Sequence, residues 1–324
     1  MDTRRQRITM SDVAREAGVS RATVGFVLSN DPHQTISPAT REKVQEAARR
    51  LGYQPFAPAR LLRTGRSSVV LLVIQTIHIA PIYAYVVEPL AKALSTHGLN
   101  LLWQIGVSPD PGQPHPASDL VPAVVVSLIE EPDRVSEEFL QRFGVPVVHT
   151  ISESSRKQYL GARLQATYLL DKGHRHLAVA ASPQSVRREA HREAIFQTCS
   201  EYGVEPPMVV TAPERRSALR QVLATLLSEN PAPTAVCAAD DETALAILAA
   251  LADLAVPVPG RVAVIGIGNL SLAHLSVPAL TTVSIADPAS YIERLTENVL
   301  AASRGEPLCD PAPLSYRVVV RKSA

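Results

Sequence analysis

Residues 8–53 carry helix-starting and helix-stopping residues at short intervals, and this pattern restricts the fold more than any other feature of the chain. Thr9, with Asp12 three positions later, matches a capping box at the start of a first helix. Gly18 ends this helix and permits a tight turn to a second helix that Ser20 can cap. The pattern predicts two short helices joined by a glycine turn.

A third helix is predicted to end at Gly52 and to begin after Ser37, because Ser37 is a cap residue and Pro38 is favoured at the first helical position. Each segment has apolar residues on one face: Val13, Ala14 and Ala17; Val24, Val27 and Leu28; Val44, Ala47, Ala48 and Leu51. Three short helices with a glycine in the first turn are typical of a helix-turn-helix unit.

After Ser67 the pattern changes to alternating strands and helices. The expected strands are Val69–Ile74, Leu99–Ile105, Ala123–Leu128, Val145–His149, His176–Ala181, Ala235–Ala239 and Val262–Ile267. The expected amphipathic helices are Val87–His97, Gly161–Lys172, Arg188–Tyr202, Arg216–Asn230 and Glu242–Ala255. This alternation predicts a doubly wound α/β architecture with parallel sheets.

Charge is divided unequally between the two regions. Residues 1–66 contain twelve Arg and Lys side chains against six Asp and Glu, a net charge of +6. The whole chain has 32 basic and 31 acidic side chains, so the remainder has 20 against 25, a net charge of −5. A basic head suits a polyanionic partner, and an acidic body disfavours nonspecific binding to that partner.

Several classes of protein are disfavoured by the sequence. Cys199, Cys237 and Cys309 are widely spaced, so neither a disulfide framework nor a zinc site is expected, and a reducing cytoplasm fits this cysteine usage. The first residues lead into a polar helix instead of an apolar signal core. The apolar run Thr243–Val258 is interrupted by Asp253 and is too short to span a bilayer, so no membrane partner is expected.

Candidate catalytic groups are few. Asp240, Asp241 and Glu242 could bind a divalent cation, but acids at a helix start more often cap the helix. His191 and Glu193 are separated by one residue, so they cannot share a helix face as an acid/base pair. The sequence contains neither a Walker loop nor a Gly-x-Gly-x-x-Gly fingerprint. We therefore expect no enzymatic activity, no cofactor and no metal site.

The head resembles that of LacI-type repressors, with caps, turn, aromatic position and hinge in register over Thr9–Asn30, Ser37–Val44, Leu51–Pro55 and Ala59–Arg66. The rest of the chain resembles, more weakly, the two-lobed body of that family in Gly161–His174, Asn230–Leu245 and Val277–Val283. The resemblance implies a small all-α head on an α/β body similar to periplasmic sugar-binding proteins.

The resemblance also implies a division into parts. These are a helix-turn-helix DNA-binding domain at residues 8–53, a hinge at 54–66, and an effector-sensing and dimerisation domain at 67–324. The first lobe of the last part would comprise about residues 67–152 and 287–312, and the second lobe about residues 153–286 and 313–324.

In this family the second helix is the recognition helix, which enters the major groove of DNA. Arg21, Ala22 and Phe26 would then face base edges, with Arg21 able to bridge guanine O6 and N7. Phosphate contacts would come from Ser20, Thr23, Asn30, Thr40 and Tyr53. The alternative for Phe26 is a place in the apolar core of the head.

In the hinge, the resemblance implies that Leu62 is a wedge between base pairs of the minor groove, flanked by Arg60 and Arg63. Phe56 replaces a usual Asn, and Pro58 replaces a helix former. The alternative is a flexible linker whose Leu62 packs against the body.

Four residues stand where the family contacts its effector: Lys157, Arg192, Asp240 and Asn269. Lys157 replaces a usual Asp, and Gly268-Asn269 replaces an Asp-Asp pair, so acceptors for sugar hydroxyls are lost. Ile77–Tyr85 makes the rim of the first lobe apolar. We therefore expect an anionic or partly apolar effector in preference to a neutral sugar. The Pro-rich stretch Asp110–Pro122 supports the alternative of a vestigial, ligand-free cleft.

Together these features predict a cytoplasmic, nucleoid-associated transcriptional regulator, a repressor that binds double-stranded operator DNA. One recognition helix contacts few bases, so a homodimer on a palindromic operator is expected. The alternative is a solute-binding protein of transport type, which would share the body but needs an export signal and no basic head.

Overall fold

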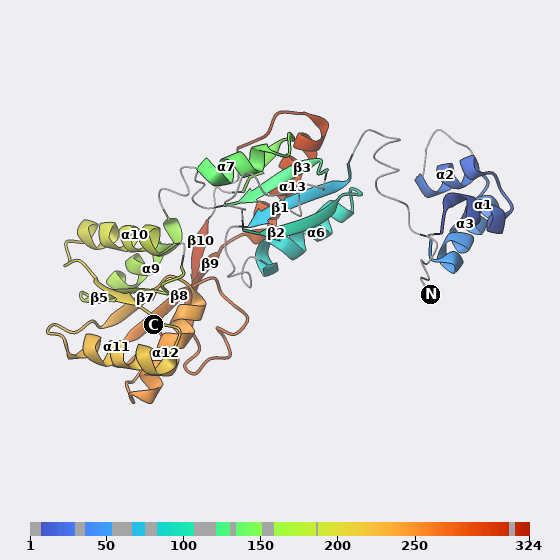
Figure 1. The fold of residues 1–324 in the computed structure, drawn as a ribbon. Helices are drawn as coiled ribbons and strands as arrows, with labels where there is room; N and C mark the ends of the chain where they lie inside the picture. Colours follow the sequence, from blue (N-terminus) through green and yellow to red (C-terminus); the bar gives the residue numbers. More distant parts are fainter. Residues whose placement is uncertain are drawn as a thin grey trace, which may run out of the picture. The chain divides into compact units, whose positions relative to one another are not determined.

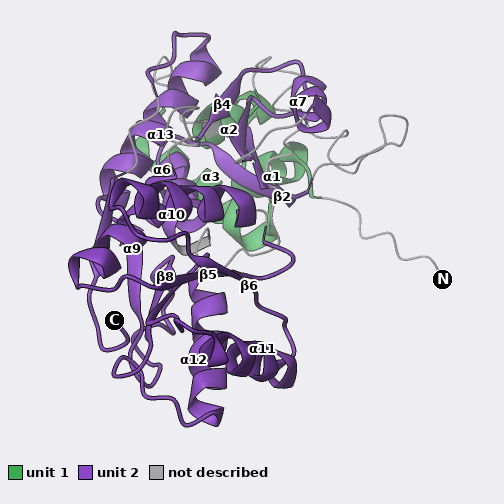
Figure 2. Ribbon diagram, turned by 90° about the vertical axis from the view of Figure 1, so that its left-hand side faces the viewer, with its two compact units in different colours: residues 1–67 green, residues 68–324 purple. Residues whose placement is uncertain are grey.

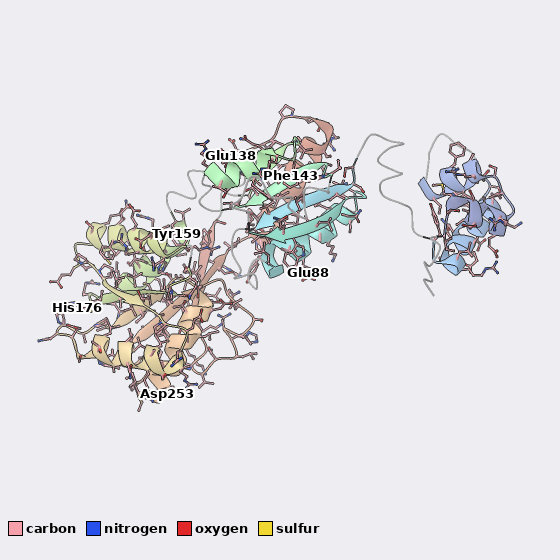
Figure 3. The ribbon with its side chains drawn as sticks, in the orientation of Figure 1. Glu88, Glu138, Phe143, Tyr159, His176 and Asp253 are labelled. Atoms are coloured by element: carbon pink, nitrogen blue, oxygen red, sulfur yellow. The ribbon has the colours of Figure 1, made fainter. Side chains whose placement is uncertain are left out.

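The computed structural model describes residues 8–29, 36–53, 67–74, 83–106, 121–129, 134–150, 159–185, 187–310 and 315–324. The chain divides into two compact units, a head (Met1–Ser67) and a body (Ser68–Ala324), which are coloured separately in Figure 2.

The described part of the head contains the helices α1 (Met10–Ala17), α2 (Arg21–Ser29) and α3 (Pro38–Leu51). The predicted capping box is present, since the Thr9 N–H donates to Asp12 Oδ2 at 2.9 Å and the Asp12 N–H donates to Thr9 Oγ1 at 3.4 Å. Gly18 ends α1 with φ of 66°, a left-handed conformation that glycine adopts at little cost. The buried residues of the head core are Val13, Ala14, Val24, Val27, Val44, Ala47 and Ala48.

The body contains two sheets, each with its own core, and we call each sheet with its helices a lobe (Figure 1). The strands of the first lobe are β1 (Val69–Ile74), β2 (Asn100–Ile105), β3 (Val124–Leu128) and β4 (Val147–His149). They are parallel, in the order β2-β1-β3-β4. A π-helical turn η1 (Tyr83–Val87) leads into α6 (Glu88–Ser95), and α7 (Arg134–Gln141) lies between β3 and β4 in sequence.

The strands of the second lobe are β5 (Leu177–Ala181), β6 (Met208–Thr211), β7 (Ala235–Ala238), β8 (Ala263–Ile267), β9 (Thr281–Ile285) and β10 (Tyr316–Val319). Their order is β10-β9-β8-β7-β5-β6, and β10 alone among them runs antiparallel to its neighbour. The helices are α9 (Leu160–Asp171), α10 (Arg188–Glu201), α11 (Arg216–Ser228) and α12 (Asp241–Asp253).

Side chains on successive residues of β7 pack into different cores. Val236 belongs to the apolar cluster that includes Leu219 of α11 and Ile247 of α12. Cys237 belongs to the cluster that includes Leu169 of α9, and α9 and α10 flank this face of the sheet in Figure 1. Both faces of the sheet are therefore covered by helices, as a parallel sheet requires.

The chain passes between the lobes near its C-terminal end. After β9 of the second lobe it forms α13 (Pro288–Arg304), which packs on the first sheet through Tyr291, Ile292, Leu295 and Val299. The Tyr291 hydroxyl donates to Thr150 O at 3.2 Å. The chain then returns to add β10 to the second sheet. The predicted fold class, a helical head and a two-lobed α/β body with parallel sheets, is confirmed.

The expected strands and helices occur with ends shifted by one or two residues in most cases. The strands β6, β9 and β10 and the helices α7 and α13 were not among the expected elements. None of the described helices is long and apolar enough to cross a membrane.

Candidate functional site

The N-terminal end of α2 is built by local hydrogen bonds. Ser20 Oγ accepts from the Thr23 N–H at 3.0 Å and lies 2.8 Å from Thr23 Oγ1. A bond of the same kind starts α3, where Ser37 Oγ accepts from the Thr40 N–H at 3.2 Å. Ser20, Thr23 and Thr40 thus stand at helix starts, where backbone N–H groups point outward and favour an anion such as a phosphate.

One face of α2 is buried and the other is exposed. Val24 and Val27 are buried in the head core, whereas Arg21 and Ala22 are exposed. Phe26 lies four residues after Ala22, on the same side of the helix, and is half-buried. Among the described residues of the head, Phe26 is not a member of the apolar core cluster. The three predicted base-reading residues therefore share one face of α2.

Some basic side chains of the head form ion pairs within the head. Arg15 pairs with Asp12 at 3.0 Å, and Arg49 pairs with Glu46 at 2.7 Å. The hydrogen bond from Thr9 to Asp12, with the charge of Arg15 as a smaller cause, lowers the pKa of that carboxyl group. Within the described part of the head, Arg21 has no side-chain hydrogen bond or ion pair. Its side chain is exposed at the start of α2.

Tyr53 follows the end of α3. Its N–H donates to Ala48 O at 2.9 Å, and its ring packs against the head core. Among the other predicted contacts, Asn30, Arg60, Leu62, Arg63 and Lys157 lie outside the described residues.

Asp240 and Asp241, the acids at the start of α12, have structural partners. Asp240 caps the helix, since its Oδ1 accepts from the Thr243 N–H at 2.7 Å. Asp241 is 1 % exposed and accepts from the Leu270 N–H at 2.7 Å and from the Thr282 hydroxyl. Burial raises its pKa to about 6, because a low-dielectric environment disfavours the charged form. Among the described residues no group of three or more potential ligands is arranged to hold a metal ion.

Asn269 is held at the carboxyl end of β8 by side chains from distant parts of the body. Its Oδ1 accepts from Arg321 Nη2 at 2.6 Å. Its Nδ2 donates to the Tyr85 hydroxyl at 3.2 Å, and that hydroxyl donates to Asn269 O at 3.2 Å. Sequence reasoning singled out Asn269 but assigned no role to Arg321, and it treated Tyr85 only as part of an apolar rim.

Arg192 has different neighbours. On α10 its Nε donates to Glu189 Oε2 at 3.0 Å, and its guanidinium stacks 5.2 Å from the ring centroid of Phe196. The structure therefore brings Asn269 together with Arg321. Arg192 instead contacts Glu189 and Phe196 of its own helix.

His191, next to Arg192, is buried in the core of the second lobe. Its Nε2 lies 2.8 Å from Gln165 Oε1, and Gln165 Nε2 donates to Ala238 O and Ile265 O. Burial lowers the pKa of His191 to about 3, so the imidazole is neutral near pH 7. These hydrogen bonds link α10 and α9 to β7 and β8. His191 and Gln165 therefore stabilise the packing of helices on the sheet.

Comparison with known proteins relates both the head and the body to bacterial transcriptional regulators. Residues 9–55 match the family described as bacterial regulatory proteins, lacI family, and residues 166–324 match the periplasmic binding protein-like domain. The HTH-type transcriptional regulator CelR of Thermobifida fusca is 31 % identical over 306 residues, with 87 % of this chain and 88 % of that protein covered. Catabolite control protein A of Priestia megaterium is 27 % identical over 333 residues, with 98 % and 99 % covered.

Solved structures agree on the fold. The lac repressor dimer bound to operator and the anti-inducer ONPF superposes with a TM-score of 0.78 at 20 % identity, over 98 % of this chain and 99 % of that chain. The complex of the regulator CelR with cellobiose superposes with a TM-score of 0.64 at 25 % identity, over 98 % and 100 %. The proteins in these comparisons are regulators and not enzymes.

Proposed function

Since this chain belongs to the lacI family of bacterial regulatory proteins and is a DNA-binding transcriptional regulator, we propose that α2 reads a palindromic operator from the major groove. The observation that carries this proposal is the exposed face of α2 with Arg21, Ala22 and Phe26 on it. Arg21 contributes a forked donor for guanine, and Ala22 and Phe26 contribute apolar contact, as to a thymine methyl group.

Register on the DNA comes from contacts to phosphates. Ser20 and Thr23 stand at the start of α2, and Thr40 stands at the start of α3. Asn30 and Tyr53 complete the set that the resemblance implies. The chain acts as a homodimer, and two heads on one palindromic site double the number of base contacts. Bound in this way, it represses transcription.

The test compares DNA binding by the intact chain and by a body fragment that starts at Ser67. An operator is first selected from random duplexes, and its dissociation constant is then measured at several salt concentrations. The intact chain should show a steep salt dependence, with a slope of about −0.9 per phosphate neutralised. Undiminished operator affinity in the body fragment would refute the assignment of DNA binding to the head.

For the body we propose a small-molecule sensor whose effector is anionic or partly apolar. Support comes from the polar groups between β8 and the C-terminal segment. The cation of Arg321 lies beside Asn269, and Asp241 already has two hydrogen-bond donors as partners. A guanidinium forks readily onto a carboxylate or phosphate. Arg192 supports the proposal less, because the carboxylate of Glu189 pairs with it, whereas Arg321 donates to the neutral oxygens of Asn269 and Leu280.

Thermal-shift measurements with sugars, sugar phosphates and organic acids test this part, because a ligand that binds only the folded state raises its stability. Stabilisation by an organic acid or sugar phosphate, coupled to a change in operator affinity, is the expected result. One relative is known as a complex with cellobiose. Stabilisation by such a neutral disaccharide would contradict the proposed effector class, and no response to any compound would favour a vestigial cleft.

A further inference from the structure

The two lobes are joined by a hydrogen-bonded contact between residues 184 positions apart in the sequence. Tyr85 lies in the π-helical turn η1 of the first lobe, and Asn269 follows β8 of the second lobe. Two bonds connect them, one from the Tyr85 hydroxyl to Asn269 O and one from Asn269 Nδ2 to the Tyr85 hydroxyl, both 3.2 Å long. A single phenol thus donates to the main chain and accepts from the side chain of the same residue.

Arg321 fixes the orientation of the Asn269 amide. A guanidinium has donors only, so the amide atom that faces Arg321 Nη2 at 2.6 Å must be the oxygen. The other amide atom, Nδ2, is then the one that faces Tyr85. Arg321 is itself held, since its Nη1 donates to Leu280 O at 2.7 Å. The donors and acceptors along Arg321, Asn269 and Tyr85 are therefore mutually consistent.

The second-lobe end of the contact rests on a rigid support. Asn269 has φ of 51°, in the left-handed region where Asn is tolerated better than most side chains. Its N–H donates to Thr282 Oγ1 at 3.3 Å, and the following residue, Leu270, donates its N–H to the buried Asp241. These bonds tie the loop after β8 to β9 and α12. A preorganised residue loses little entropy when it binds a partner, which favours the bond to Tyr85.

We propose that Tyr85, Asn269 and Arg321 form an interlobe tie that holds the two lobes in one closed arrangement and so sets the DNA-binding state of the regulator. All of the groups in the tie belong to this chain, namely three side chains and the main-chain carbonyl of Asn269. It rests on the proposed function only for its effect on operator affinity, because the closure of the lobes is a property of the body alone. An effector that opens the lobes must break both bonds to Tyr85, and one that closes them further must accommodate the phenol.

Distance measurements by pulsed electron spin resonance on the full-length protein test the tie. The parent carries Cys309→Ser to remove the exposed cysteine, while Cys199 and Cys237 are buried and resist labelling. Spin labels are attached through Gln141→Cys at the end of α7 in the first lobe and Gln197→Cys on α10 in the second, both exposed. Labelled chains are diluted with unlabelled ones, so that the measured distances lie within one chain.

Three variants are compared with the parent. Tyr85→Phe removes both bonds between Tyr85 and Asn269. Asn269→Asp keeps an acceptor for Arg321 and removes the donor to the phenol. Tyr168→Phe is the control, because the Tyr168 hydroxyl donates to Ala324 O at 3.1 Å within the second lobe. Circular dichroism first establishes that each variant is folded.

We expect a single narrow distance in the parent and the control. In Tyr85→Phe the population with separated lobes should rise about 2- to 12-fold for each hydrogen bond lost, with a smaller rise in Asn269→Asp. Identical distance distributions in Tyr85→Phe and Tyr168→Phe would overturn the tie.

Operator affinity is measured on the same variants as a second readout. A several-fold change confined to Tyr85→Phe and Asn269→Asp supports the link from the tie to DNA binding. If the lobes separate and operator affinity stays equal to that of the parent, that link is wrong. If the parent itself does not bind operator, the proposed function fails while the distance result still decides the tie.

Discussion

The carboxylate of Asp241 packs directly against the backbone of Gly266, so that a Cβ atom at position 266 would overlap with Asp241 Oδ1. The contact leaves Asp241 positioned to accept from Leu270 and Thr282. Gly266 lies in the buried strand β8, where neither neighbour can move away without cost. Position 266 therefore requires glycine because of the buried acid beside it, and not because of a turn in the backbone.

Gly266→Ala is therefore expected to destabilise the body by about 1–3 kcal/mol, the usual cost of overpacking a well-filled core. Urea unfolding followed by circular dichroism measures this. Gly161→Ala in α9 is the matched control, because its Cβ would lie 3.6 Å from the nearest atoms of Tyr316, an ordinary contact. Alanine also favours a helix over glycine, so the control should be neutral or more stable. Equal effects of the two substitutions would contradict the proposed overlap.

The pH dependence of stability should carry the signature of Asp241. Its pKa in the folded state is raised to about 6 from the ordinary 3.8, so the folded state binds the proton more tightly than the unfolded state. The stabilisation from this proton is present below about pH 4 and is lost as the pH rises through 6. This difference between the folded-state and unfolded-state pKa corresponds to about 3 kcal/mol in the free energy of unfolding.

Asp241→Asn removes this titration and leaves the other groups in place. Unfolding free energies of both proteins are compared from pH 4 to 7.5. We expect the stability of the natural protein relative to the variant to fall by up to about 3 kcal/mol over this range. A constant difference between the two proteins would show that Asp241 ionises at its ordinary pKa.

Local signals in the sequence predicted most elements of this fold. The capping box at Thr9, the turn at Gly18 and the cap at Ser37 depend on residues three or four positions apart, and the structure confirms all three. The strand Val69–Ile74 was predicted with the observed ends, because a run of six apolar residues suits a strand buried on both faces.

The strand β9, which was missed, depends on contacts between distant segments. The strand β9 reads Thr-Thr-Val-Ser-Ile, which is not an apolar run, and yet Thr281 and Thr282 are buried. Their hydroxyls are satisfied by Ala324 and Asp241, which lie about 40 positions away in the sequence. Only the folded chain provides these partners, so the pattern of β9 alone could not reveal a buried strand.

In the candidate site, too, local roles could be predicted from the sequence, and contacts between distant residues could not. The capping role of Asp240 follows from its position before a helix, and the structure agrees. Which arginine lies beside Asn269 does not follow from position, because Arg321 reaches it after the chain has left the second lobe for α13 and returned. Arg321 follows three valines just after the end of β10, and this position is a local signal for such a role.

The hinge residue Leu62 lies outside the described residues, and its role stays a prediction from the resemblance. Leu62→Ala should reduce bending of the operator and flatten the base preference at its centre, which is about 1–3 kcal/mol per base pair in specific complexes. Gel mobility of circularly permuted operator fragments measures the bend. Leu61→Ala is the control, with the same change one position away. If both variants bend the operator like the natural protein, Leu62 is not a wedge.

Arg21 is expected to read one base pair in each half-site. Its side chain is exposed at the start of α2 and, within the described part of the head, has no ion pair. Arg21→Ala should cost about 1–3 kcal/mol at that base pair and relax the preference there. Arg49→Ala removes the same charge from α3, where Arg49 pairs with Glu46 at 2.7 Å, and serves as the control. It should weaken binding equally for all sequences, because loss of a distant charge acts through the phosphates.

The two variants are compared by selection from a randomised half-site followed by sequencing, so that each position is scored separately. A flattened preference at a single position in Arg21→Ala, with an unchanged profile in Arg49→Ala, is the outcome that a guanine contact requires, because the fork of two N–H donors matches O6 and N7 of one base. If the profiles of the two variants coincide, Arg21 contributes only its charge. The base-reading face of α2 would then have to lie around Phe26, whose ring could contact a thymine methyl group without any arginine beside it.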